Sequence, residues 1–168
     1  MHKYSIAPIA AAVLLAFAGS AEAANKTAPF TVSASVASNC LVTATNMAFG
    51  AYTGVAQLTS TSGVTVRCTN GLGYTVKLSS GGGSYGTRLL SDGGSNTLQY
   101  NLYTSAANTS IWGDGTTGST AAVTGTGGGL ASGSAVTHTV YGTLPDNGTN
   151  QAAPVGSYSD SITATVEY

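Results

Sequence analysis

Short runs in which apolar and polar residues alternate one by one recur along this chain, and residues that favour turns separate them. This period of two is typical of β-strands with one buried face, because successive side chains of a strand point to opposite sides. The alternation predicts strands at residues 30–37, 40–45, 63–69, 74–78, 97–103, 135–143 and 159–168. We therefore expect an all-β protein.

The composition agrees with strands and argues against several other classes of protein. Ser, Thr and Gly account for 68 of the 168 residues, and only 7% of the residues are charged. A charged fraction far below the roughly 25% of ordinary soluble domains, with a net charge of −1, provides no basic surface for nucleic acid. Disorder is not expected either, since the chain is 42% hydrophobic and contains 9 Tyr.

The length fits one domain, and several short strands with Gly-rich turns favour a β-sandwich. The turn Asn70-Gly71 between two of the strands predicts a hairpin. A further short strand is expected near 121–124, because a structureless loop over 105–134 would be unusual in a compact domain. Tyr158, just before the last strand, is expected either to cap a strand corner of the sandwich or simply to be buried.

The first residues have the pattern of a secretory signal peptide. A short basic region with Lys3 precedes an apolar stretch at 6–18, and Ala21-Glu22-Ala23 forms an A-x-A cleavage site. We expect cleavage between Ala23 and Ala24. The apolar stretch is shorter than the roughly 20 residues that a transmembrane helix needs, and no later segment is suited to span a bilayer.

The chain contains two cysteines, Cys40 and Cys68. In an exported chain, such a pair predicts one disulfide. A zinc site is disfavoured, because two Cys and the distant His138 provide fewer than the four ligands of structural zinc. In the chain-entropy model, a bridge over a loop of this size contributes roughly 3–4 kcal/mol to stability.

The ionisable residues predict no catalytic site, no metal and no cofactor. A hydrolytic triad would need His138 as its base, but His138 lies in the middle of a predicted strand. Asp92 and Asp114 are each followed by Gly among turn residues, so we interpret both as turn formers rather than as glycosidase carboxylates. The glycine runs at 81–83 and 127–129 lack the Lys and the strand–helix setting of a phosphate-binding loop.

Several short motifs follow one another in a characteristic order. They are Cys40 followed by Phe49-Gly50-Ala51-Tyr52; Val64 to Thr69 leading to Tyr74 to Ser79; Tyr85 to Leu89 with Arg88; Leu98 to Tyr103; Trp112 to Thr116; Val140-Tyr141-Gly142; and Gly156 to Asp160. Their order resembles that of the spore coat protein U domain family, which includes the pilins of archaic (Csu-type) chaperone–usher pili. The resemblance covers nearly the whole chain after the signal peptide.

This resemblance implies an incomplete immunoglobulin-like β-sandwich that lacks one strand. The missing strand is supplied first by a periplasmic chaperone. At the outer-membrane usher, it is then supplied by the N-terminal segment of an identical or related pilin subunit. The implied organisation is a signal peptide (1–23), a donor-strand segment (24–39) and a pilin domain (40–168).

The donor strand implied by the resemblance lies within 28–37. Its apolar face consists of Phe30, Val32, Ala34 and Val36. The strand pattern agrees on one point, because six predicted strands follow the first Cys, one fewer than in a seven-stranded sandwich, and a seventh precedes it. The residues alone leave open whether this strand packs in its own domain, and the resemblance favours donation between subunits.

The last predicted strand is expected to border the acceptor groove and to contact the chaperone. Ile162, Ala164 and Val166 alternate near the end of the chain, which leaves an unpaired edge. The carboxylate of Tyr168 is a suitable anchor for a basic chaperone residue. The alternative is an ordinary terminal edge strand.

The leading hypothesis is a structural pilus subunit that is exported through the periplasm to the cell surface, polymerises by strand donation and serves adhesion or biofilm formation. A spore or cell-envelope coat protein is the alternative to which the family's name points, and an adhesive sugar-binding module is a third. A tip adhesin would be expected to carry a second domain, for which this chain has no room.

Overall fold

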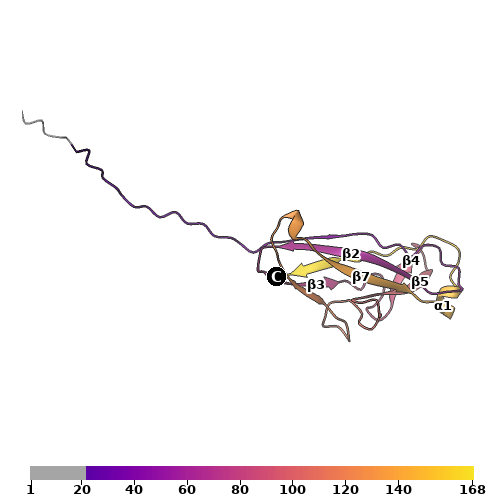
Figure 1. Cartoon of the computed structure of the whole chain (residues 1–168). Helices are drawn as coiled ribbons and strands as arrows, with labels where there is room; N and C mark the ends of the chain where they lie inside the picture. The colour runs from indigo at the N-terminus through magenta and orange to yellow at the C-terminus, as the bar shows by residue number, and fades with distance from the viewer. Residues whose placement is uncertain (1–21) are drawn as a thin grey trace, which may run out of the picture. The chain divides into compact units, whose positions relative to one another are not determined.

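The computed structural model describes residues 22–168, and Val36–Tyr168 form its folded unit. The predicted all-β fold is confirmed, because the described residues contain eight strands and two short helical turns (Figure 1). The strands are β1 (Cys40–Ala44), β2 (Leu58–Cys68), β3 (Gly73–Leu78), β4 (Arg88–Ser91), β5 (Thr97–Tyr103), β6 (Val123–Thr126), β7 (Val136–Leu144) and β8 (Ala164–Glu167). The helical turns are η1 (Ser132–Ser134) and α1 (Gly148–Gln151).

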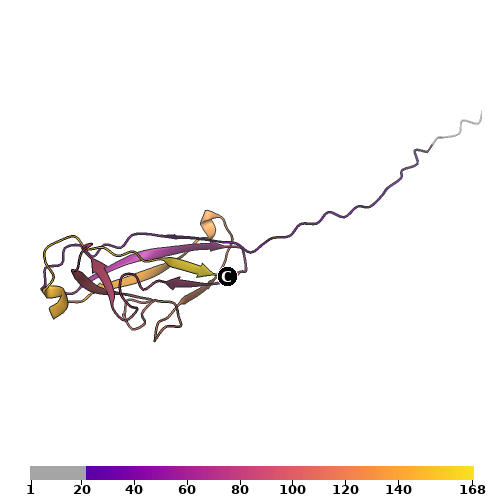
Figure 2. The same cartoon turned by 180° about the vertical axis from the view of Figure 1, so that it is seen from behind.

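The strands form two sheets, which Figures 1 and 2 show from opposite sides. One sheet has the order β1-β2-β7-β5-β4, and the other has the order β6-β3-β8. All these neighbours are antiparallel. In the described chain, β1 pairs with β2 alone and β8 with β3 alone, so both are edge strands. The arrangement is an incomplete immunoglobulin-like sandwich.

The core consists of the residues that the two sheets turn toward each other. The buried hydrophobic members on the strands are Val64, Val66, Cys68, Tyr74, Val76, Leu78, Leu98, Tyr100, Leu102, Val140 and Leu144. They alternate along their strands, as the sequence pattern predicts. Trp112 is 0% exposed, and its indole N–H donates to the Val76 carbonyl at 3.0 Å. This bond satisfies the polar atom of the largest buried side chain.

The predicted hairpin between residues 63–69 and 74–78 is wrong, because β2 and β3 belong to different sheets. The connection between them is tied to another segment, since the Gly71 N–H donates to the Gly127 carbonyl and the Gly127 N–H donates to the Leu72 carbonyl, both at 2.8 Å. Both strands turn an apolar face toward one core from opposite layers. Alternation identifies that inward face but does not identify the neighbouring strand.

Strand β4 was not predicted, because its inward residue is an arginine. Arg88 is 0% exposed and donates to the carbonyl oxygens of Ser79 and Trp112, at 2.9 and 2.7 Å, and to Asn101 Oδ1 at 2.6 Å. The Tyr85 ring lies 5.5 Å from the guanidinium carbon. Burial lowers the pKa of Arg88. These acceptors replace the hydration that the cation loses.

The remaining differences concern the ends of strands. Residues 121–124 were expected to form a strand, but β6 runs from Val123 to Thr126, and Ala121 forms only an isolated bridge with Trp112. The last strand begins at Ala164 rather than at Ser159, since Ser159 still bridges to Ser91 in the other sheet. The chain must cross between the sheets before it pairs with β3.

Residues 30–37 form no strand in the described chain. The prediction of a strand there is not met in a single chain, because an extended segment without a partner has no ladder for its backbone groups. Its apolar side chains are exposed: Phe30 is 85%, Val32 81% and Val36 87% exposed.

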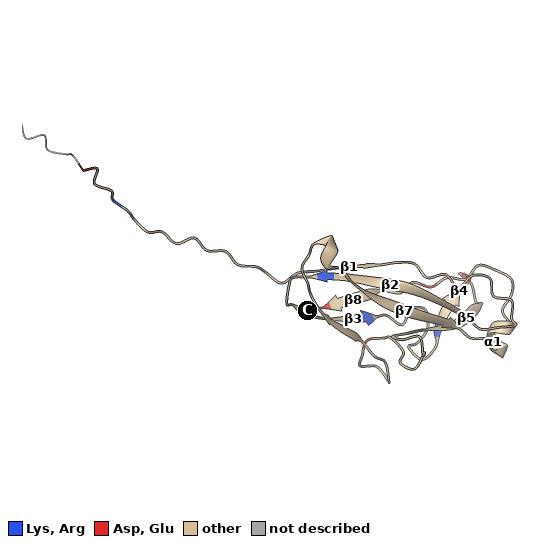
Figure 3. Cartoon of the chain, in the orientation of Figure 1, with Lys and Arg blue, Asp and Glu red and all other residues tan. Residues whose placement is uncertain are grey.

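The few charged residues are scattered over the folded unit (Figure 3). The pair Lys77 and Glu167 joins β3 to β8 with an N–O distance of 2.7 Å. None of the helices among the described residues has the length and apolar character to cross a membrane.

Candidate functional site

A groove of about 1040 Å³ opens between the two sheets at one edge of the sandwich. Its floor is one side of the buried core, formed by Val64, Leu78, Leu98, Leu102, Val140 and Leu144. One wall consists of residues 44–52, which follow β1, and the other consists of residues 153–164, which lead into β8. The groove therefore lies where a further strand would complete the sandwich.

The predicted acceptor edge lies partly on this groove. Ile162 and Ala164 line it, and Val166 is half-buried against the core opposite Val76 of β3. Tyr168 is 59% exposed. The alternation of the last residues thus places three side chains on the inward face. The edge strands β1 and β8 also contact each other.

The opposite wall contains residues that sequence reasoning did not assign to a site. Met47 and Phe49 pack against the core, and Phe49 meets the Tyr100 ring edge-on at 6.0 Å. A side chain at Gly142 would collide with Met47 and Phe49, so this glycine permits their close approach. The alternation of Met47 and Phe49 was the available signal, but it is too short to define a strand.

At the outer end of this wall, the Tyr52 hydroxyl donates to Asp146 Oδ1 at 2.7 Å. Desolvation and this carboxylate together raise the pKa of Tyr52 to about 12. The bond ties the wall to the loop before α1.

A hydrogen bond from β5 fixes the other wall near the point where it leads into β8. The Tyr100 hydroxyl on β5 donates to Asp160 Oδ2 at 2.5 Å, and Asp160 Oδ1 accepts from the N–H groups of Gly82 and Ser161 at 2.9 and 2.7 Å. Burial, followed by the carboxylate, raises the pKa of Tyr100 well above its usual value. Asp160 therefore holds the chain in place as it crosses from one sheet to the other.

Tyr158 supports the same wall. Its hydroxyl donates to the carbonyl of Pro154, four residues upstream, at 2.7 Å. This contact is that of a tyrosine at a strand corner, the first of the two roles expected from the sequence. This hydrogen bond joins two residues of the loop between α1 and β8 and so stabilises that loop.

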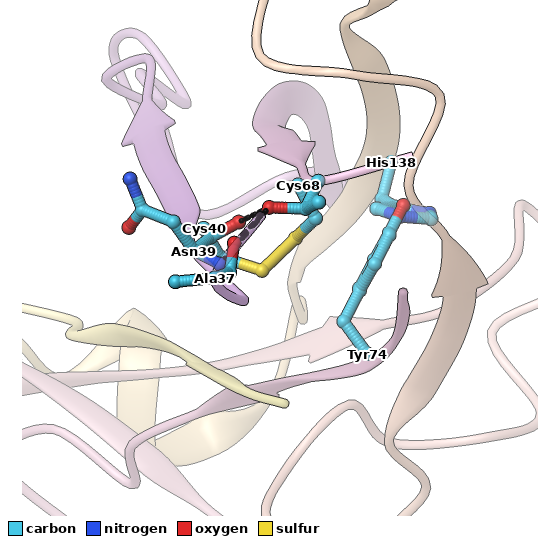
Figure 4. Close-up of a disulfide and its surroundings, with 7 residues drawn as sticks. Ala37, Asn39, Cys40, Cys68, Tyr74 and His138 are labelled. Carbon is cyan, nitrogen blue, oxygen red and sulfur yellow. Dashed lines mark hydrogen bonds between the residues drawn. A yellow bond between two sulfur atoms is a disulfide. The ribbon is translucent and has the colours of Figure 1, made fainter. Parts of the chain in front are cut away.

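The predicted disulfide between Cys40 and Cys68 is present (Figure 4). The two residues face each other in the β1–β2 ladder, with a Cα–Cα distance of 4.1 Å. The bridge therefore attaches the edge strand β1, and with it one wall of the groove, to the interior strand β2.

The structure gives the other candidate residues local roles. Asp92 Oδ1 accepts from the Gly94 N–H at 2.8 Å, and Asp114 Oδ1 accepts from the Thr116 and Thr117 N–H groups. Hydrogen bonds lower the pKa of both aspartates. They are turn formers, as interpreted from the sequence.

His138 lies on β7, where its Nε2 is 3.0 Å from the Tyr74 hydroxyl (Figure 4). Among the described residues, no three His, Cys, Asp or Glu side chains are grouped so that they could hold a metal ion.

The predicted donor residues Phe30, Val32, Ala34 and Val36 are exposed and outside any strand. The proposed cleavage site between Ala23 and Ala24 lies in an exposed segment without secondary structure. The rest of the predicted signal peptide lies outside the described residues.

The family model of the spore coat protein U domain matches residues 26–165. This chain belongs to the spore coat protein U domain family. The match includes the residues of the predicted donor segment as well as the sandwich, and it confirms the resemblance seen in the motifs. Membership in a family of structural subunits agrees with the expectation that the chain is not an enzyme.

One solved structure supports the fold assignment. It is the crystal structure of the CsuC–CsuE chaperone–tip adhesion subunit pre-assembly complex from archaic chaperone-usher Csu pili of Acinetobacter baumannii. The TM-score is 0.55 and the sequence identity is 22%. The match covers 79% of this chain and 40% of that chain. A search of the curated proteins gave no match.

Proposed function

We propose that the chain is a structural subunit of a pilus assembled by the chaperone–usher pathway, in which the N-terminal segment of each subunit fills the groove of its neighbour. The observation that carries this proposal is the open groove of about 1040 Å³, whose floor is the core itself. The same chain holds an alternating segment, 30–36, with exposed apolar side chains. The groove of one subunit and the segment of the next subunit form one contact between the two.

The chemistry of the segment suits the groove. Phe30, Val32 and Val36 would each gain roughly 1.5–3 kcal/mol on burial, and Ala34 less. The intervening side chains are Ser and Thr, which would face solvent. The backbone of the inserted strand would pair with the free edges of β1 and β8, which each have one described neighbour. Insertion between them must part these two strands where they are in contact.

The proposed partners are a periplasmic chaperone, an outer-membrane usher and identical or related subunits. An unfilled groove leaves apolar side chains of its walls, such as Met47, Phe49 and Ile162, partly exposed, so the subunit needs a cover between export and polymerisation. We propose β8 as the contact, with Ile162, Ala164 and Val166 facing the inserted chaperone strand and the Tyr168 carboxylate as its anchor. The family match supports this scheme, and so does the similar solved structure, which is a complex of a chaperone with a pilus subunit.

Deletion of residues 24–37 tests the proposal. When co-expressed with the chaperone, the shortened subunit should still co-purify with it but should not cap another subunit, so that no polymer forms. Ser33→Ala in the full chain is the matched control, because it changes the outward face alone and should polymerise normally. The proposal is withdrawn if the deletion unfolds the domain and abolishes chaperone binding while the wild type is a stable monomer without chaperone.

A coat protein of the spore or cell envelope is a second candidate, favoured by the name of the family. Such a coat would use the same groove and segment. Genes for a chaperone and an usher beside this gene would support the pilus, whose role would be surface attachment or biofilm formation. Their absence would favour the coat.

A further inference from the structure

Thr69 holds Ala37, the last residue of the predicted donor strand, and residues 38–39, which connect that strand to β1. The Thr69 N–H donates to the Asn39 carbonyl at 2.9 Å, and the Asn39 N–H donates to Thr69 Oγ1 at 3.0 Å. The Thr69 hydroxyl lies 3.2 Å from the Ala37 carbonyl and 3.3 Å from that of Asn39, so these two acceptors share its proton. Figure 4 shows Ala37 and Asn39 beside the disulfide.

These contacts extend the β1–β2 ladder beyond its last pair, Cys40 and Cys68. The Thr69 side chain takes the place of a main-chain acceptor for the Asn39 N–H, and it also reaches one residue further, to Ala37. Residues 37–39 are therefore bound to Thr69, the residue that directly follows β2. Three of their six polar main-chain groups are bonded to Thr69: the Ala37 carbonyl, the Asn39 N–H and the Asn39 carbonyl.

A subunit with a groove and a donor strand in one chain can fill its own groove. The effective concentration of a strand on a short linker is in the millimolar range, so this closed monomer competes strongly with polymerisation. To reach the free edge of its own β1, the segment must reverse direction within residues 37–39. A turn that tight needs the N–H and C=O groups of those residues for its own hydrogen bonds.

We propose that Thr69 is a positioning residue that opposes this reversal, and that it thereby favours insertion of the donor strand into a neighbouring subunit over insertion into its own groove. This inference rests on the proposed function, because it concerns the choice between two acceptors for the same strand. The Ala37 carbonyl and the Asn39 N–H must both leave Thr69 before the turn can form.

The test uses the chain from Ala24 to Tyr168, unfolded and then refolded without chaperone at several concentrations. Wild type is compared with Thr69→Val, which keeps the shape but removes the hydroxyl, and with Thr69→Ser, which restores the hydroxyl. Thr65→Val is the matched control, because it removes a threonine hydroxyl on β2 itself, one that is 2.9 Å from Thr137 Oγ1. Size-exclusion chromatography separates monomer from polymer, and a fluorescent peptide of residues 28–37 reports whether a monomer has an open groove.

We expect Thr69→Val to raise the ratio of monomer to polymer about fivefold, which corresponds to about 1 kcal/mol for one net hydrogen bond. The Thr69→Val monomer should not bind the peptide, because its own strand fills the groove. Thr69→Ser and Thr65→Val should give the same ratio of monomer to polymer as wild type. An unchanged ratio of monomer to polymer, or a Thr69→Val monomer that binds the peptide, overturns the inference. The proposed function still stands in that case if the wild type polymerises. If Thr69→Val does not fold, Thr69→Ala replaces it and should give the same change in the ratio of monomer to polymer. A wild type that neither polymerises nor binds the peptide overturns both.

Discussion

At the scale of single residues, His138 should make the stability of the domain depend on pH. It is half-buried beside Tyr74 and Trp112, and desolvation lowers its pKa. The unfolded chain, with an ordinary His pKa near 6.5, therefore binds a proton at a higher pH than the folded domain does. The free energy of unfolding should fall as the pH drops below about 6.5, until the folded pKa is passed.

Urea midpoints between about pH 5 and about pH 8 measure this dependence. His138→Gln keeps a partner for the Tyr74 hydroxyl and cannot be protonated, so its profile should be flatter than that of wild type in this window. Equal slopes for the two proteins would show that another group is responsible.

Arg88 shows how far single residues can be predicted from the sequence. A cation in a chain with few charges is expected at the surface, yet Arg88 is fully buried, because main-chain carbonyls of two separate segments converge on it. That convergence depends on the tertiary fold and leaves no local pattern. Cys40, Cys68 and the two turn-forming aspartates were predictable, because their roles follow from their number or from their immediate neighbours.

At the scale of elements, the two faces of the donor strand should respond differently to the same substitution. Val32→Asp would bury an unpaired carboxylate in the neighbour's groove, which costs more than the lost apolar contact. Ser33→Asp places the same charge on the solvent side, one residue along the strand. Polymer yield from chaperone-bound subunits should therefore collapse for Val32→Asp and stay near that of wild type for Ser33→Asp. Equal yields would exclude this register for the strand.

Strands were predictable wherever alternation lasts for several residues, as in β3, β5 and β7. The neighbour of each strand in the sheet was not predictable, because alternation shows only which side of a strand faces the core. The wall formed by residues 44–52 was missed for a related reason. Beyond Thr45 it belongs to no strand, and its place on the groove is set by contacts such as Phe49 on Tyr100 and Tyr52 on Asp146.

At the scale of the whole molecule, folding should be completed only by the strand that fills the groove. A subunit without residues 24–37 has an unfilled groove, so a peptide of residues 28–37 should stabilise it by mass action. A ligand that binds only the folded state adds about 2.7 kcal/mol at a concentration of 100 times Kd. The urea midpoint should thus rise with the logarithm of the peptide concentration. A peptide with Val32→Asp is the control and should leave the midpoint unchanged, since its charge cannot enter the groove. If the shortened subunit were as stable without peptide as the assembled wild type, the sandwich would be complete on its own and the groove would have no role in assembly.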